Sequence, residues 1–292
     1  MRKITVAGYG FIERLGADES LLLVKNAGFD GIDYPLYEED RREEFSLDGG
    51  SDPAAAARVR SVANSLGLSV GQTHAPFGYR ADDGSTQESI LDIYKRAAEA
   101  TAMLGAKGMV LHPVKFEDCK YGYRREECFD LNLELFSRLA PFLKGCGVIG
   151  LLENMFIKEQ KDGFSRLVPT IYSTGEELSR AADTLGEQYA VCLDSGHALI
   201  TGEDIPAMVR TIGDKLFALH LHDNTRERDD HLPPYFGKLP FASLLGALKE
   251  IKYSGNLNFE VRFTSVPKGA LPTALKYVRD IGVTFRQMLD GE

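Results

Sequence analysis

One pattern is repeated along the chain: a short apolar or β-branched run, a polar loop, and an amphipathic helical segment. Eight such runs occur, and we predict strands at residues 4–9, 31–34, 68–74, 108–112, 148–153, 190–194, 216–220 and 256–260. Strands that alternate with helices predict a parallel sheet, and eight of them predict a closed barrel. The expected fold is therefore a (β/α)8 TIM barrel of the α/β class, with its active site at the C-terminal ends of the strands.

Helix boundaries in this pattern follow from capping residues, prolines and glycines. Asp52-Pro53 predicts a helix start that Gly67 ends, and Ser85-Thr-Gln-Glu88 reads as a capping box for a helix that runs to about Leu104. An open, doubly wound sheet is the alternative architecture. It is disfavoured because no G-x-G-x-x-G or P-loop motif follows the first strand and because polar residues end nearly every strand.

Length and composition narrow the class of protein. A chain of 292 residues is long enough for two average domains, but one barrel takes roughly 250 residues, so we predict a single domain over residues 1–292. The net charge of −9 argues against a nucleic-acid partner. The four cysteines form no C-x-x-C pair, and no stretch reaches the ~18 apolar residues of a membrane helix. These features predict reduced thiols, a cytoplasmic location and no membrane association.

Side chains that bind metals end most of the predicted strands. Strands three to eight end, one residue each, in His74, His112, Glu153, Asp194, His220 and Glu260. A parallel barrel directs all these strand ends to one face. Glu153 and Glu260 each close an apolar run, and a buried carboxylate is costly unless it is paired with a cation or a metal. The set therefore predicts a divalent-metal site.

At these residues the sequence resembles the xylose isomerase-like barrels, a family of sugar isomerases and epimerases that also includes endonuclease IV, an abasic-site nuclease. The resemblance covers essentially the whole chain. It rests on Thr73-His74-Ala-Pro-Phe, Val110-Leu-His112-Pro, Leu152-Glu153-Asn154, Leu193-Asp194-Ser-Gly-His197-Ala, His220-Leu-His222-Asp223-Asn224, Asp229-Asp230-His231 and Phe259-Glu260.

The resemblance to the isomerases and epimerases implies one metal held by Glu153, Asp194, His220 and Glu260. Such ligands suit Mn²⁺, Mg²⁺, Co²⁺ or Zn²⁺, which would polarise the carbonyl of a small carbohydrate substrate. Glu153 and Glu260 would exchange a carbon-bound proton through an enediolate. The resemblance also implies substrate contacts, for which the candidates are His197, Arg226, His74 and His112. It leaves the oligomeric state open, with a homo-oligomer among the alternatives.

The nuclease branch of the same family implies a second hypothesis. That branch holds three zinc ions, and its additional ligands match His74, His112, His197, Asp229 and His231. The segment Ala75-Pro-Phe-Gly-Tyr79 and the run Phe236-Gly237-Lys238 depart from the nuclease pattern. A dehydratase or lyase that uses the same enediolate is a further alternative, and so is a metal-binding scaffold without activity.

Loops after the strands carry further candidates. The phenylalanines Phe11, Phe77, Phe156 and Phe236 lie in such loops, where they would wall a sugar pocket or pack the loops themselves. The segment Lys158–Arg166 in the long loop after strand five is expected to be a lid or an insertion.

Overall fold

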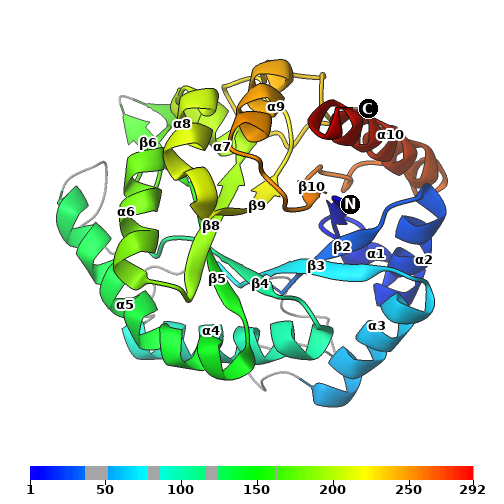
Figure 1. Cartoon of the computed structure of the whole chain (residues 1–292), viewed down its shortest axis with the longest axis horizontal. Helices are drawn as coiled ribbons and strands as arrows, with labels where there is room; N and C mark the ends of the chain where they lie inside the picture. Colours follow the sequence, from blue (N-terminus) through cyan, green and yellow to red (C-terminus); the bar gives the residue numbers. More distant parts are fainter. Residues whose placement is uncertain (37–51, 78–85, 116–123, 162, 292) are drawn as a thin grey trace.

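The computed structural model describes residues 1–36, 52–77, 86–115, 124–161 and 163–291. Eight parallel strands form one sheet in the order β10-β1-β2-β3-β4-β5-β8-β9, with helices in a ring outside them (Figure 1). Backbone hydrogen bonds from Leu221 to Asn258 and from Glu260 to Leu221 join the two edges of this sheet. The sheet therefore closes, and the predicted (β/α)8 TIM barrel is confirmed.

The elements follow one another in the predicted alternation. The strands are β1 (Ile4–Ala7), β2 (Gly31–Pro35), β3 (Ser69–His74), β4 (Gly108–Leu111), β5 (Ile149–Glu153), β6 (Phe156–Lys161), β7 (Phe164–Pro169), β8 (Tyr189–Asp194), β9 (Leu216–His220) and β10 (Leu257–Phe259). The α-helices are α1 (Ile12–Leu15), α2 (Ala17–Ala27), α3 (Pro53–Ser65), α4 (Gln87–Leu104), α5 (Arg125–Cys146), α6 (Gly175–Leu185), α7 (Ser195–Thr201), α8 (Ile205–Ile212), α9 (Phe241–Glu250) and α10 (Leu271–Asp290).

Local capping explains where several helices begin. The Asp52 side chain accepts a hydrogen bond from the backbone N of Ala54 at 2.9 Å, and Pro53 occupies the first position of α3 as predicted. The capping box of α4 lies one residue later than expected. It pairs Thr86 with Ser89, and Ser85 lies outside the described residues.

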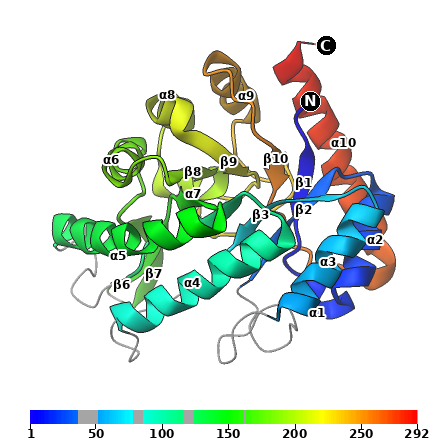
Figure 2. The same cartoon turned by 60° about the horizontal axis from the view of Figure 1, so that its bottom comes forward.

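Two features interrupt the simple alternation. The segment expected as a long loop after β5 is an antiparallel hairpin, in which β6 pairs with β7 from Phe156 opposite Pro169 to Lys161 opposite Phe164. Figure 2 shows this hairpin below α5, at one end of the barrel. The short helix α7 directly follows β8, and Asp194 is its capping residue. Neither element was predicted: the hairpin includes the charged segment Lys158–Arg166, which shows no apolar alternation, and the 7 residues of α7 span only about two helical turns.

The barrel interior below the strand ends has an apolar half and a polar half. Side chains along a strand point alternately into and out of the barrel. Where the side chain at the end of a strand points inward, the side chain two residues earlier therefore points inward too. On β4, β5, β8 and β9 these inward residues form one buried apolar cluster, which consists of Val110, Leu151, Cys192 and Ala218. On β10, β1, β2 and β3 they are polar and buried, and they are Asn258, Thr5, Asp33 and Gln72.

The cysteines differ from expectation at one position. Cys146 and Cys192 are free thiols, whereas Cys128 is disulfide-bonded. The prediction of reduced cysteines is therefore wrong for Cys128, and Cys119 lies outside the described residues. Within the described part of the chain, the helices are too short or too polar to cross a membrane.

Candidate metal centre

Four acidic and imidazole side chains meet at the mouth of the barrel. The atoms that they offer as ligands all lie within 4.8 Å of one another, and they belong to Glu153, Asp194, His220 and Glu260. Nδ1 of His220 is central, because it lies 2.7 Å from Oε1 of Glu153, 3.3 Å from Oε2 of Glu260 and 3.9 Å from Oδ2 of Asp194. All four residues are buried. We call this group the strand-end cluster.

The backbone places these side chains where the strand pattern predicts. Glu153, Asp194 and His220 are the last residues of β5, β8 and β9, and Glu260 directly follows β10. Asp194 is fixed further because its Oδ1 accepts a hydrogen bond from the backbone N of His197 at 2.6 Å. One residue therefore ends a strand, caps a helix and faces the cluster.

Two further histidines approach the second oxygen of Glu153. Nε2 of His112 lies 2.6 Å from Oε2 of Glu153, and Nε2 of His74 lies 3.5 Å from the same oxygen. Within the described residues, neither His112 Nε2 nor Glu153 Oε2 makes a hydrogen bond of acceptable geometry. Glu153 thus offers one oxygen to His220 and the other to this histidine pair.

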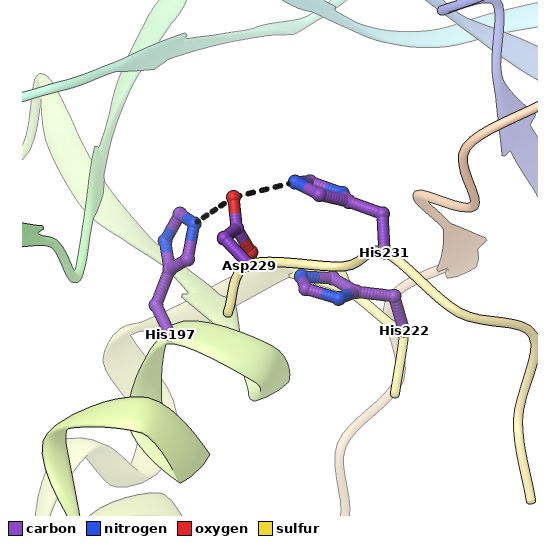
Figure 3. Close-up of side chains that lie close together, drawn as sticks. All are labelled: His197, His222, Asp229 and His231. Atoms are coloured by element: carbon purple, nitrogen blue, oxygen red, sulfur yellow. Dashed lines mark hydrogen bonds and ion pairs between the residues drawn. The ribbon is translucent and has the colours of Figure 1, made fainter. Parts of the chain in front are cut away.

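A second cluster lies beside the first. It consists of His197, His222, Asp229 and His231, whose ligand atoms also lie within 4.8 Å of one another (Figure 3). Oδ2 of Asp229 lies 2.8 Å from Nε2 of His231 and 3.7 Å from Nε2 of His197. Nε2 of His222 lies 3.0 Å from both carboxylate oxygens of Asp194, so Asp194 touches both clusters. We call this group the loop cluster.

The loop after β9 is held in place by its own hydrogen bonds. Asp223 accepts bonds from the backbone N atoms of Gly237 and Leu239, and its backbone pairs with that of Leu232. His231 has a φ of +46°, a conformation uncommon for residues other than glycine, and its Nδ1 bonds to the carbonyl oxygen of Glu260 at 3.0 Å. These contacts bring Asp229 and His231 over the barrel mouth.

The pKa values of the two glutamates shift in opposite directions. Burial raises the pKa of Glu153, but His220 and His112 beside it hold the pKa well below its usual range. For Glu260, burial and the carboxylates of Glu153 and Asp194 raise the pKa, although His220 and His231 oppose them. In the metal-free protein Glu153 is therefore an anion, while Glu260 holds a proton more readily than an ordinary glutamate.

The pKa values of the histidines also shift in different directions. Burial lowers the pKa of His112 to about 4, so its imidazole is neutral at pH 7. Burial would also lower the pKa of His231, but the carboxylates of Asp229 and Glu260 raise it to about 9. Burial is likewise outweighed at His197 by Asp194 and Asp229, which raise its pKa well above the usual value. Protonated histidines therefore balance the carboxylates when no metal does.

A cavity of about 300 Å³ opens over both clusters. Its lining includes Phe77 and Phe156, two of the phenylalanines expected at a pocket wall. The other two lie elsewhere, because Phe11 is buried in the core and Phe236 is 64% exposed. The residues that line the cavity are Tyr9, His74, Phe77, His112, Glu153, Met155, Phe156, His197, Asp229, His231, Glu260 and Arg262.

The arginine at this cavity is not the expected one. Arg226 is exposed on the loop after β9 and is not part of the cavity lining, whereas Arg262 lies in it with its guanidinium 5.9 Å from the ring centre of Tyr9. Three other groups of functional interest were also missed from the sequence: His222, Asp33 and the polar residues around Asp33. For His222 a signal existed, because alternation along His220-Leu-His222 places both imidazoles on one side of the strand.

The donor set fits a divalent metal. Carboxylate oxygens and imidazole nitrogens are the ligands of Zn²⁺, Mn²⁺, Co²⁺ and Mg²⁺ sites. The contact between His112 and Glu153 is consistent with a metal, because it brings a neutral imidazole nitrogen and a buried carboxylate oxygen within 2.6 Å of each other. Oδ1 of Asp229 likewise has no hydrogen bond within the described residues.

Comparison with models of protein families shows the family of this chain. The model of the xylose isomerase-like TIM barrel matches residues 21–281 of this chain. The chain belongs to this family. Among sequence relatives of this xylose isomerase-like protein, an uncharacterized protein of Sinorhizobium fredii is 26% identical over 68% of the chain and 60% of its own length. An uncharacterized protein of Mycobacterium leprae is 25% identical over 86% of each chain. The chain thus spans less than two thirds of the first relative.

Solved structures of the family share the whole barrel. A D-tagatose 3-epimerase-like protein has a TM-score of 0.74 at 18% identity and covers 99% of this chain, with 98% of its own chain matched. A 3-keto-D-glucoside 4-epimerase from E. coli has a TM-score of 0.72 at 18% identity, over 96% of this chain and 100% of its own. A D-psicose 3-epimerase solved in the presence of D-fructose has a TM-score of 0.72 at 14% identity, over 99% and 100%. At these identities the likeness concerns the fold.

Proposed function

We propose that this protein is a divalent-metal-dependent isomerase or epimerase of a sugar or sugar derivative. One observation carries the proposal: Glu153 and Glu260 reach the same atom, Nδ1 of His220, from different strands at 2.7 and 3.3 Å, and both line the cavity. The epimerases of like fold support it. Residues 1–292 are taken as one domain. The cytoplasmic location and a homo-oligomeric state stay predictions.

In this proposal the strand-end cluster holds the metal through Glu153, Asp194, His220 and Glu260. When bound, Mn²⁺, Zn²⁺, Mg²⁺ or Co²⁺ would act as a Lewis acid that polarises a carbonyl and its neighbouring hydroxyl. His112, neutral at pH 7 because burial lowers its pKa to about 4, lies beside the second oxygen of Glu153. The cavity accepts a ligand of the size of one monosaccharide, because its volume of about 300 Å³ lies at the small end of ligand pockets.

The two glutamates perform the proton transfer. One carboxylate removes the proton on carbon beside the carbonyl, which gives an enediolate, and the other returns a proton. Return to the opposite face of the same carbon inverts that centre, whereas return to the neighbouring carbon interconverts an aldose and a ketose. The positions of Glu153 and Glu260 suit this work, because the two carboxylates reach the cavity from the ends of different strands, β5 and β10.

Substrate oxygens are oriented by the residues around the glutamates. We assign His197, His74 and His112 to this role, since all three line the cavity. Arg262 is added from the structure as a donor of charge-assisted hydrogen bonds. For Arg226, which the family resemblance implies, a substrate contact requires that the loop after β9 move its side chain toward the cavity.

The loop cluster favours a second candidate function, a phosphodiesterase with three zinc ions that resembles endonuclease IV. The observation is that His197, His222, Asp229 and His231 form a second ligand group next to the first. Together with His74 and His112 beside Glu153, the barrel mouth provides ligands for additional metal ions. A dehydratase or lyase would use the strand-end cluster in the same way as the isomerase.

One experiment separates these functions. The protein is loaded with each metal and incubated in deuterated water with a panel of ketoses, and exchange of carbon-bound hydrogen is followed by NMR, while cleavage of abasic-site DNA is assayed in parallel. We expect metal-dependent exchange that falls on the order of 10²–10⁴-fold in Glu153→Gln and Glu260→Gln. Metal-dependent DNA cleavage without hydrogen exchange on any sugar would refute the isomerase and support the phosphodiesterase. Exchange that leads to loss of water or of a carbon fragment would indicate the dehydratase or lyase.

A further inference from the structure

Asp33 lies at the centre of a buried polar network inside the barrel. Its side chain is on β2, directly below the strand-end cluster, and only 2% of the residue is exposed. Oδ2 accepts hydrogen bonds from Nε2 of Gln72 and from Nδ2 of Asn258, each at 3.0 Å. The Thr5 hydroxyl in turn donates to Oδ1 of Asn258 at 2.8 Å. The same Asp33 oxygen lies 3.1 Å from Nε2 of His220.

This contact differs from those of the other histidines. His74, His197 and His231 direct Nδ1 to a backbone carbonyl, of Ala75, Asn154 and Glu260 respectively, and present Nε2 to the clusters. His220 has the reverse orientation, because Nδ1 faces the cluster and Nε2 faces Asp33. In His220 the ring nitrogen that faces away from the cluster, Nε2, therefore contacts a carboxylate. In the other three histidines the nitrogen that faces away, Nδ1, contacts a neutral carbonyl oxygen.

A carboxylate at this place determines where the proton of His220 resides. Carboxylate oxygens accept hydrogen bonds, so the approach of Asp33 Oδ2 to Nε2 is favourable when Nε2 carries a proton. Nδ1 lies 2.7 Å from Oε1 of Glu153, and a metal that displaces the proton from Nδ1 gains its lone pair as a ligand if Asp33 keeps the other proton on Nε2. Gln72 gives a competing arrangement, because its Nε2 lies 2.9 Å from the same ring nitrogen and would donate to an unprotonated Nε2. That arrangement would put the proton on Nδ1 and block the ligand atom.

We propose that Asp33 is a positioning residue that fixes the Nε2–H tautomer of His220 and thereby prepares Nδ1 to bind the metal. The proposal rests on the metal site of the proposed function, but not on the reaction or on its substrate. The polar half of the barrel interior supports it. Four strands place polar residues where the other four place an apolar cluster, and this network ends at His220. Burying such a network is unfavourable for a barrel core, the more so because Oδ1 of Asp33 has no hydrogen bond within the described residues.

The test compares metal affinity in two matched variants. Asp33→Asn keeps the shape and removes the charge, whereas Thr5→Val removes a buried hydrogen bond of the same network that reaches His220 only through Asn258 and Asp33. Each protein is freed of metal with a chelator, and Co²⁺ and Zn²⁺ are titrated by chelator competition, with the visible spectrum of bound Co²⁺ recorded. We expect Asp33→Asn to weaken binding about 10–100-fold and to change the Co²⁺ spectrum, while Thr5→Val stays within about 3-fold.

A measurement on the unaltered protein keeps the test independent of variant folding. In the Zn²⁺-loaded protein labelled with ¹⁵N-histidine, we expect the proton of His220 on Nε2 and Nδ1 bound to zinc. The proposal is overturned if NMR places the proton on Nδ1, if Asp33→Asn leaves the affinity within about 3-fold, or if Thr5→Val weakens it equally. It is also overturned, together with the proposed function, if the unaltered protein binds no metal. Metal binding that depends on Asp33 without sugar turnover would leave this inference standing and refute only the isomerase.

Discussion

Nε2 of His112 lies 2.6 Å from Oε2 of Glu153, and both atoms are buried. Burial lowers the pKa of His112 to about 4, so at pH 7 this imidazole is neutral and does not balance the carboxylate. A buried carboxylate is stable in a folded protein when a cation lies near it. The contact therefore predicts how the protein responds to metal.

Removal of metal should destabilise the protein. A metal at 100 times its dissociation constant adds about 2.7 kcal/mol to the free energy of unfolding, which corresponds to roughly 4–5 °C for a chain of this size. We expect chelator treatment to lower the unfolding temperature by this amount and Zn²⁺ or Mn²⁺ to restore it. Differential scanning calorimetry checks this, with Glu153→Gln as the variant that loses the response. An unfolding temperature that chelator and metal leave unchanged would refute a metal site.

The two glutamates should differ in their effect on metal affinity. Glu153 faces His220 with one oxygen and His112 with the other, whereas Glu260 contributes one oxygen and has a raised pKa. Loss of a charged contact costs about 1.5–3 kcal/mol, so we expect Glu153→Gln to weaken binding on the order of 100-fold and Glu260→Gln by ~10-fold. Equilibrium competition with a metal indicator gives both constants. The reverse order would show that Glu260 is the principal ligand.

Metal affinity should rise with pH. The pKa of His231 is raised to about 9 and that of His197 is also raised, so both are protonated at pH 7 in the metal-free protein. A metal at the loop cluster must displace these protons, and its binding therefore weakens as the pH falls and strengthens up to about pH 9. Calorimetry in two buffers of different ionisation enthalpy counts the protons released. His231→Gln should flatten the profile between pH 7 and 9, and an affinity independent of pH would contradict the prediction.

The two arginines give a direct comparison of structure with family resemblance. Arg262 lines the cavity and Arg226 does not. We expect Arg262→Ala to raise KM about 10–100-fold, because a charge-assisted hydrogen bond to substrate is lost, and Arg226→Ala to change it less than ~3-fold. Steady-state kinetics on the sugar identified by hydrogen exchange measures both. A larger effect at Arg226 would show that its loop closes over the substrate.

Gly196 predicts a steric effect on the loop cluster. A Cβ at this position would lie 2.0 Å from the imidazole of His222, which is buried and cannot move away without losing Asp194. Gly196→Ala should therefore destabilise the protein by about 1–3 kcal/mol. The control is Gly246→Ala in α9, where a Cβ meets nothing within 4 Å, and which should stabilise by about 0.5–1 kcal/mol. Denaturant unfolding gives both values, and equal effects would mean that His222 has room to shift.

Much of the candidate site was predictable because its signals are local. Glu153, Asp194 and His220 end apolar runs, and the strand period places such residues at one face of a barrel. Asp33 and Asn258 could not be found in this way, since they are 225 residues apart and neither ends a strand in the sequence pattern. Arg262 was missed for a related reason: only the closed barrel shows that the segment after Glu260 passes the cavity.

Barrel closure has a consequence for how the site is assembled. β1 pairs with β10, so Ile4 meets Leu257, and the same closure brings Asn258 to Asp33, whereas Glu260 meets His220 on the neighbouring β9. Contacts between residues so distant in sequence form late in folding, because a very long loop must close first. A folding intermediate that lacks β10 would have three of the four strand-end ligands and an unfinished network around Asp33. High-affinity metal capture would then coincide with the final docking step, so metal uptake during refolding would report the arrival of β10.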